Sequence, residues 1–164
     1  MAVKKSIQTA VAACSFAGLA LLAACQQDGM NAGLSPTQGY SLHFVDEGDR
    51  AKLAYGQANS DNVGLMLECA KGSRNVEISD VARGSNGKLR LQSGQARSDF
   101  GGAIVPGPGA NIVTASGSAQ TPALRAFRDT GRIEVEHGGR RYGVTATPAE
   151  QVDVKRFFAM CEQA

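Results

Sequence analysis

The sequence predicts a mainly β domain: an antiparallel sandwich or small barrel of seven or eight strands, with a short helix and a C-terminal helix packed on the sheet. Three observations lead to this fold class. Short runs of residues alternate between apolar and polar side chains, which is the period of a half-buried strand. Turn-forming residues, drawn from 20 glycines and 5 prolines, separate these runs. Two segments with the helical spacing of apolar residues follow residue 120.

The first hairpin is expected within residues 40–55, where two alternating runs flank the turn-forming residues Glu47 and Gly48. Folded at this turn, the two strands place their apolar side chains on one face. His43 then falls on the other face, beside Lys52. The expected cross-strand pairs are Phe44 with Ala51, Leu42 with Leu53 and Tyr40 with Tyr55.

The middle of the chain continues the strand pattern. Residues 63–69 alternate in the same way and turn Cys69 toward the interior. Further strands are expected around residues 76–78 and 89–91, and Asn86-Gly87 before the second of these is typical of a tight hairpin turn. We expect all of these strands to present one apolar face to a common core.

Two stretches depart from this regularity. Val81 falls out of step with the apolar residues before it, which predicts a bulge or the end of a strand there. Residues 93–118 are interrupted by Gly101-Gly102 and by Pro106-Gly107-Pro108-Gly109. Glycine and proline break regular structure, so this stretch forms either one loose hairpin or a long loop.

Two helices are predicted in the C-terminal third. Thr121-Pro122 is a typical helix start and Gly131 a typical helix end. The second helix begins at residues 147–150, Thr-Pro-Ala-Glu, whose Thr and Glu can form a capping box. Each helix has one apolar face. The residues on these faces are Leu124 and Phe127 in the first helix, and Val154, Phe157, Phe158 and Cys161 in the second.

Between the two helices, Gly138-Gly139 predicts a hairpin with a two-residue turn. Apolar residues would then share one face, and opposite charges would meet on the other face. Periodicity and charge therefore support one register. The expected pairs are Val135 with Tyr142, Ile133 with Val144 and Glu136 with Arg141.

The first residues resemble a secretory signal, with the basic pair Lys4-Lys5 followed by the uncharged, Ala- and Leu-rich residues 6–24. A permanent membrane span and an ordinary cleaved signal are the alternatives. Gln8 and Thr9 make this stretch a poor span, and an ordinary signal would not need a cysteine after Leu-Ala-Ala. We therefore predict a leader that is removed on export.

Leu22-Ala23-Ala24-Cys25 resembles the cleavage box of bacterial lipoprotein signals. The resemblance implies a diacylglycerol on the Cys25 thiol, cleavage before Cys25 and acylation of the new amine. Gln26 is similar to the residue found at this place in lipoproteins of the outer membrane, which implies an anchor there with the domain facing the periplasm. Two or more acyl chains together hold a protein firmly on a membrane. The expected organisation is a removed signal at 1–24, a lipidated cysteine and flexible tether at 25–38, and a single β-rich domain at 39–164.

Four cysteines divide into two groups. Cys14 leaves with the leader and Cys25 is capped by lipid, so Cys69 and Cys161 remain in an oxidising compartment. Such an even pair predicts a disulfide. Closing a loop of about 93 residues would stabilise the fold by roughly 4–5 kcal/mol through loop-closure entropy. A redox or metal-binding pair is the alternative, but CxxC spacing and a neighbouring histidine are both missing.

Composition limits the partners. Removing 24 of the 164 residues leaves 140, enough for one domain with a modest core. Lys4 and Lys5 leave with the leader, so 15 basic residues remain against 15 acidic ones. A net charge near zero argues against a nucleic acid partner. The lack of Trp and the presence of only three Tyr disfavour an aromatic-lined sugar cleft.

Motifs of common catalytic and metal sites are missing from the sequence, including the GxSxG nucleophile turn and HExxH. We therefore predict no catalytic residue, no metal site and no cofactor. His43 and His137 are both expected at the surface, and the acids of residues 46–49 in a solvated turn rather than a Ca²⁺ loop. Five arginines lie close together in the C-terminal third. We expect them either to form cross-strand ion pairs on a solvated face or to bind the acidic surface of a partner. They are Arg125, Arg128, Arg132, Arg140 and Arg141.

The sequence identifies no biochemical activity, and two hypotheses follow from it. The first is a non-catalytic binding or structural protein of the envelope, acting on an envelope protein or polymer. Lipid-anchored lysozyme inhibitors are similar in being small, tethered and disulfide-closed, but Ser116-Gly117-Ser118-Ala119 lacks the Arg-Tyr of their Ser-Gly-Ala-Arg-Tyr-like motif. The second is an envelope hydrolase that uses paired carboxylates. The acids available for it are Asp61, Glu68, Asp80 and Asp99.

Overall fold

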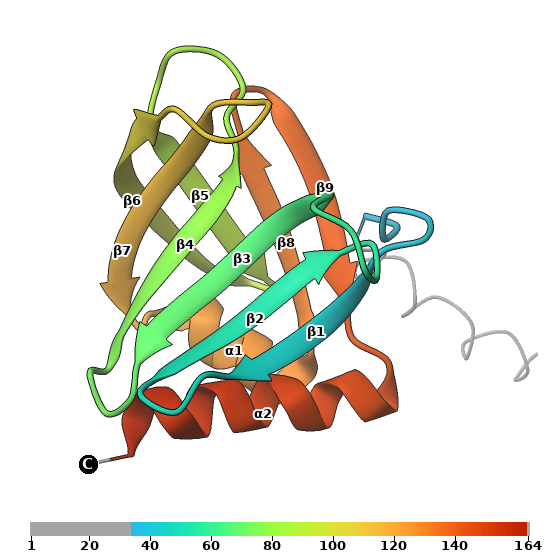
Figure 1. Ribbon diagram of the computed structural model, residues 1–164, viewed down its shortest axis with the longest axis vertical. Coiled ribbons are helices and arrows are strands. Elements are labelled where there is room, and N and C mark those ends of the chain that lie inside the picture. Colours follow the sequence, from blue (N-terminus) through green and yellow to red (C-terminus); the bar gives the residue numbers. More distant parts are fainter. Residues whose placement is uncertain (1–33, 164) are drawn as a thin grey trace, which may run out of the picture. The chain divides into compact units, whose positions relative to one another are not determined.

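The computed structural model describes residues 34–163. The predicted leader, Cys25 and most of the predicted tether lie outside these residues. Within them, nine strands form one antiparallel sheet in the order β1-β2-β3-β4-β7-β6-β5-β8-β9. The sheet curls into a half-barrel, and two helices pack on it (Figure 1). The strands are β1 (Ser41–Asp46), β2 (Arg50–Gly56), β3 (Val63–Ala70), β4 (Asn75–Val81), β5 (Lys88–Ser93), β6 (Ala96–Val105), β7 (Ile112–Ser118), β8 (Arg132–His137) and β9 (Arg140–Thr145); the helices are α1 (Pro122–Thr130) and α2 (Pro148–Glu162).

The mainly β, antiparallel fold class with two packed helices is confirmed, but the strand number of seven or eight is too low. Residues 93–118 supply the difference, because they form a hairpin of β6 and β7 rather than a loop. β6 is long and changes partner along its length, pairing with β5 up to Gly101 and with β7 from Gly102 onward. The change of partner requires a glycine at position 102. A Cβ atom there would lie 2.3 Å from the carbonyl oxygen of Thr114, so any larger residue would clash with β7.

The first hairpin forms with a different register from the predicted one. Leu42 lies opposite Tyr55 and Phe44 opposite Leu53, so the pairing is shifted by two residues, and His43 faces Ala54 rather than Lys52. The shift arises in the turn, which contains four residues, 47–50, rather than the expected two. The backbone N–H of Glu47 donates a hydrogen bond to the carbonyl oxygen of Arg50 and closes this turn. A shift of two preserves the face of every side chain, so the apolar face is retained.

The C-terminal third forms as predicted. The β8–β9 hairpin has the expected register, with Val135 opposite Tyr142. α1 ends at Gly131, whose φ of +67° is the left-handed value that favours glycine. α2 begins with the capping box of Thr147 and Glu150. Its apolar face is fully buried, and the side chains on it are Val154, Phe157, Phe158 and Cys161.

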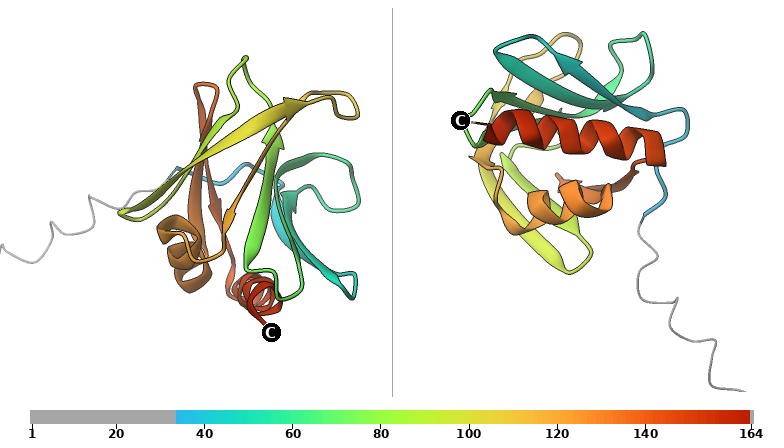
Figure 2. Two further views of the ribbon diagram at one scale, coloured as in Figure 1. Left: turned by 90° about the vertical axis from the view of Figure 1, so that its left-hand side faces the viewer. Right: turned by 90° about the horizontal axis from the view of Figure 1, so that it is seen from below.

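The core lies between the inner face of the curled sheet and the two helices. α2 crosses one open end of the half-barrel beneath β1 and β2, and α1 lies beside it against β5 and β6 (Figure 2). The helices meet through the rings of Phe127 and Phe158, whose centroids are 6.2 Å apart and edge to face. None of the helices among residues 34–163 has the length and apolar character needed to cross a membrane.

A disulfide connects the sheet to the last helix. Cys69 on β3 and Cys161 on α2 are bonded, with Cα atoms 5.7 Å apart, and both side chains are buried. These are the two cysteines that the sequence analysis paired, and they lie where the alternation of β3 and the apolar face of α2 place them. The bond closes a loop that contains most of the sheet.

Part of the predicted tether contacts the domain. Pro36 forms a parallel bridge with Gly143 at the free edge of β9. The backbone N–H of Thr37 donates a hydrogen bond to the hydroxyl oxygen of Tyr55 at 2.8 Å. Residues 34–37 therefore run beside β9 before the chain enters β1.

Candidate functional site

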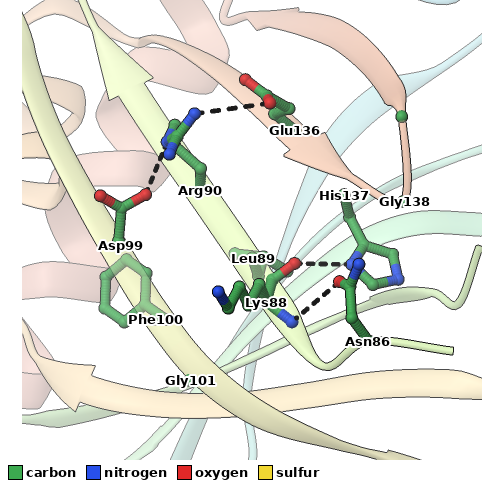
Figure 3. A pocket seen from close by; sticks show the side chains of 11 residues that line it. Asn86, Lys88, Leu89, Arg90, Asp99, Phe100, Gly101, Glu136, His137 and Gly138 are labelled. Atoms are coloured by element: carbon green, nitrogen blue, oxygen red, sulfur yellow. Dashed lines mark hydrogen bonds and ion pairs between the residues drawn. The ribbon is translucent and has the colours of Figure 1, made fainter.

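The candidate site is a pocket of about 510 Å³ on the outer surface of β5, between β6 and β8 (Figure 3). We call it the β5 pocket. It combines charged side chains with glycine backbone from three strands and two turns. The residues that line it are Asn86, Lys88, Leu89, Arg90, Asp99, Phe100, Gly101, Glu136, His137, Gly138 and Gly139.

The strand alternation creates this pocket. Leu89 and Leu91 point into the core, so Lys88 and Arg90 lie on the outer face of β5. On one side, Lys88 lies opposite Gly101 of β6. On the other side, β8 ends at His137, opposite Leu89, and the glycine turn 138–139 follows. On the β6 side of Lys88, a Cβ atom added at Gly101 would meet no described atom within 4 Å, so this side is open. On the other side, Gly138 lies against the backbone and Cβ of Arg83.

Arg90 organises the acidic side of the pocket. Its Nε donates a hydrogen bond to Asp99 Oδ1 at 2.6 Å, and its Nη1 lies 3.5 Å from Glu136 Oε1 (Figure 3). The register explains the arrangement, since Asp99 and Glu136 lie directly opposite Arg90 on the two neighbouring strands. The hydrogen bond that Arg90 donates to Asp99, together with the charges of both acids, raises the pKa of the Arg90 guanidinium.

The pocket contains two basic side chains, Lys88 and Arg90, and two acidic ones, Asp99 and Glu136, and these charges are not evenly distributed. Asp99 and Glu136 share one guanidinium, which leaves this group with one net negative charge at neutral pH. Lys88 forms no ion pair with any residue in the described part of the chain. The pocket therefore has a negative side around Arg90 and a positive side at Lys88.

His137 borders the pocket from the inner face of the sheet, where the prediction of a surface histidine is wrong. Its side chain is 2 % exposed because residue 137 follows Ile133 and Val135 in the inward phase of β8. Nδ1 lies 2.8 Å from the carbonyl oxygen of Lys88, so this nitrogen carries the proton and donates it. Nε2 is buried and has no hydrogen-bond partner among the described residues. His43, the other histidine, is partly exposed and lies 2.9 Å from Ser41 Oγ.

Asp80 is a second polar group inside the half-barrel. The residue ends the inward series of Val76 and Ile78 on β4 and is 4 % exposed. Val81 therefore lies at the end of a strand, one of the two predicted outcomes. Burial raises the pKa of Asp80, and a hydrogen bond from the Val81 N–H together with the nearby Arg140 charge offsets only part of this effect.

Tyr142 belongs to the same interior cluster. Its hydroxyl donates a hydrogen bond to the carbonyl oxygen of Gly64 at 3.1 Å, joining β9 to β3 across the core. The Arg140 guanidinium carbon lies 4.5 Å from the centre of the Tyr142 ring, a cation–π contact. Burial and the neighbouring Asp80 charge raise the pKa of Tyr142 far above its ordinary value, so the ring remains neutral.

The structure separates the four carboxylates considered for a hydrolase. Asp80 is buried on the inner face, whereas Asp99 lies on the outer face beside Arg90. Glu68 pairs with Arg50 on the neighbouring strand, and Asp61 lies exposed in the β2–β3 connection. The acid that does join Asp99 is Glu136, which the sequence analysis expected to face Arg141.

Glu136 was missed because its partner comes from a strand that is distant in sequence. Arg141 does lie opposite Glu136, but its ion pair is formed with Glu134. Arg141 of β9 and Glu134 of β8 thus form an ion pair between strands, as expected, whereas Arg128 pairs with Glu162 between the two helices. Among residues 34–163 no group of three or more His, Cys, Asp or Glu side chains is placed to hold a metal ion.

Comparison with protein-family models, with curated proteins and with solved structures finds no significant match to this chain.

Proposed function

We propose that this protein is a lipid-anchored component of a bacterial envelope that acts by binding a partner through the β5 pocket rather than by catalysis. The anchor rests on the sequence Leu22-Ala23-Ala24-Cys25, which resembles a lipoprotein cleavage box. The binding role rests on one observation, the sharing of Arg90 by Asp99 and Glu136. An anchor in the outer membrane, with the domain in the periplasm, is supported by Gln26, which resembles the residue after the cysteine in lipoproteins of that membrane.

The Arg90 group is better suited to recognition than to hydrolysis. A glycosidase general acid must hold a proton and deliver it to the leaving group. Asp99 and Glu136 instead face a permanently charged guanidinium that occupies the space between them. Asp80 does not complete a catalytic pair with them, because it lies on the opposite face of the sheet. The arrangement favours charge recognition of an envelope protein or polymer.

Crosslinking in living cells tests this function. The tagged protein is crosslinked, captured and analysed by mass spectrometry, with Cys25→Ala as the unanchored form and Arg90→Ala as the form with an altered pocket. We expect one envelope partner that is captured only with an anchored protein and an intact pocket. Lys155→Ala is the matched control, since it removes a cation from α2 far from the pocket in sequence and leaves the pocket unchanged.

Two results would contradict the proposal. Equal capture of the partner by the Arg90→Ala and wild-type proteins would remove the pocket from the interaction. Cleavage of a cell-wall polymer by the purified full chain, abolished by Asp99→Asn or Glu136→Gln, would instead establish the hydrolase.

A further inference from the structure

Gly101 stands in the β5 pocket without a structural reason to be glycine. Its φ lies outside the left-handed region, so an ordinary side chain meets no backbone strain there. A Cβ atom at this position would touch none of the described residues within 4 Å. Gly102 differs, because the carbonyl of Thr114 excludes a side chain from it. A glycine inside a strand weakens the strand and often marks a place where a ligand approaches the backbone closely. Gly101 therefore points to an occupant of the pocket.

The charges of the pocket define what this occupant carries. Among residues 34–163, Asp99 and Glu136 share the one guanidinium of Arg90, and Lys88 forms no ion pair. The side-chain oxygen of Asn86 accepts a hydrogen bond from the Lys88 backbone N–H at 3.3 Å, which leaves the Asn86 amide group as a further donor near Lys88. One side of the pocket thus matches a cation and the other side matches an anion.

The spacing of these two sides sets the size of the ligand. Asp99 and Glu136 lie opposite Arg90, two residues along β5 from Lys88 and on the same face. The row that carries the acids is therefore separated from Lys88 by roughly 7 Å along the strand. Two residues of extended peptide have about this length. Gly101 opposite Lys88 leaves room for a backbone or a small side chain to lie against β6.

We infer that the β5 pocket binds a small zwitterion: an amino acid or the free end of a short peptide that carries both an ammonium group and a carboxylate. The carboxylate binds Lys88, and the ammonium group binds Asp99 and Glu136. This inference rests on the proposed binding function and adds the chemical class of the ligand. It explains why two acids flank one arginine, since the second acid is available to the ligand.

Calorimetric titration of the full chain, purified in detergent micelles, tests the inference. The probe is the dipeptide alanyl-alanine with both ends free. N-acetyl-alanyl-alanine lacks the ammonium group and alanyl-alanine amide lacks the carboxylate, so each blocked probe removes one of the two charges. We expect saturable binding of the free dipeptide and at least tenfold weaker binding of each blocked form, as for the loss of one charge-assisted hydrogen bond.

Three variants assign the binding to the pocket. Lys88→Met removes the positive side and is expected to weaken binding at least tenfold, whereas Lys155→Met on α2 leaves it unchanged. Gly101→Leu fills the space opposite Lys88 and is expected to abolish binding while the thermal unfolding midpoint stays at or above that of the wild type. Glu136→Gln is expected to weaken binding of the free dipeptide and of the amide, which both keep the ammonium group.

The outcomes separate this inference from the proposed function. Absence of saturable dipeptide binding overturns the zwitterion, as does equal binding of the free dipeptide and of either blocked form. Binding that survives Gly101→Leu places the dipeptide outside the pocket and also overturns it. In each case, capture of an envelope partner that depends on Arg90 would leave the proposed binding function standing.

Discussion

The Glu150 carboxylate accepts a hydrogen bond from the backbone N–H of Leu42, 108 residues earlier in the chain, at 2.7 Å. Its other oxygen accepts the Thr147 N–H at 2.7 Å, which completes the capping box of α2. Leu42 lies in β1, an edge strand whose outward N–H groups have no neighbouring strand. One side chain therefore starts the last helix and fastens it to the edge of the sheet.

Glu150→Gln should lower the free energy of unfolding by about 1–2 kcal/mol, because a neutral amide replaces a charged acceptor of two backbone hydrogen bonds. Burial alone would raise the pKa of Glu150, but the hydrogen bonds from Thr147 and Leu42 lower it on balance. The stabilisation is therefore complete above the unfolded pKa of about 4.5 and is lost as the pH falls through the folded value. Urea unfolding across pH 3–7 measures both effects. Asp153→Asn on the same helix is the control, with a change within about 0.5 kcal/mol.

Asp80→Asn should raise the free energy of unfolding at pH 7, on the order of 1 kcal/mol, since the amide removes a buried charge and retains an acceptor for the Val81 N–H. The raised pKa means that the folded state binds this proton more tightly than the unfolded state. Stability from this group is greatest below the unfolded pKa of about 3.8 and declines as the pH rises through the folded value. Thermal unfolding between pH 3 and 8 checks this slope, which Asp61→Asn should leave intact. A destabilising effect of Asp80→Asn at pH 7 would contradict the assignment of a costly buried charge.

Breaking the disulfide between Cys69 and Cys161 should destabilise the domain by roughly 4–5 kcal/mol. The two cysteines are 92 positions apart, and without the bond the unfolded chain gains the conformational entropy of this open loop. The double variant Cys69→Ser/Cys161→Ser, compared with wild type in urea unfolding, measures the loss. Thiol titration of the denatured, unreduced mature protein, which lacks Cys14 and has Cys25 capped by lipid, should find no free thiol. Two reactive thiols in this experiment would refute the disulfide.

Gly117→Ala and Gly101→Ala should have opposite effects on stability. A Cβ atom at Gly117 would lie 2.5 Å from Cε1 of Phe100, so alanine forces the ring out of its place in the core at a cost of about 1–3 kcal/mol. A Cβ atom at Gly101 meets open space, and alanine there should be neutral or stabilising by up to about 1 kcal/mol. Chemical unfolding of the two variants side by side measures the difference. Equal destabilisation would mean that Gly101 has a structural role after all.

Local patterns predicted the parts of the fold that depend on neighbouring residues. The two-residue turn at Gly138-Gly139 set the β8–β9 register, and helical spacing identified the buried faces of α1 and α2. The register of β1 and β2 was wrong because a four-residue turn is not distinguished from a two-residue turn by alternation alone. The β6–β7 hairpin was left open because glycine and proline obscure its strand pattern, although they shape its bend and its tip.

The candidate site was less accessible to sequence reasoning than the fold. Arg90, Asp99 and Glu136 come from three strands, and their contact depends on β5 pairing with both β6 and β8. No local pattern reveals that β8, which follows α1, returns to the edge of β5. His137 was misplaced because it borders a glycine turn, yet the alternation of β8 already assigned it to the inner face.

Mass spectrometry of the intact protein extracted from the membrane fraction tests the central claim most directly. The account predicts a chain that begins at Cys25, lacks residues 1–24 and carries the added mass of a diacylglycerol and an N-linked acyl group. Cys25→Ala should yield only the unprocessed precursor without lipid mass. A mature chain with an unmodified Cys25 thiol, or normal processing of the Cys25→Ala protein, would contradict the lipid anchor on which the proposed function rests.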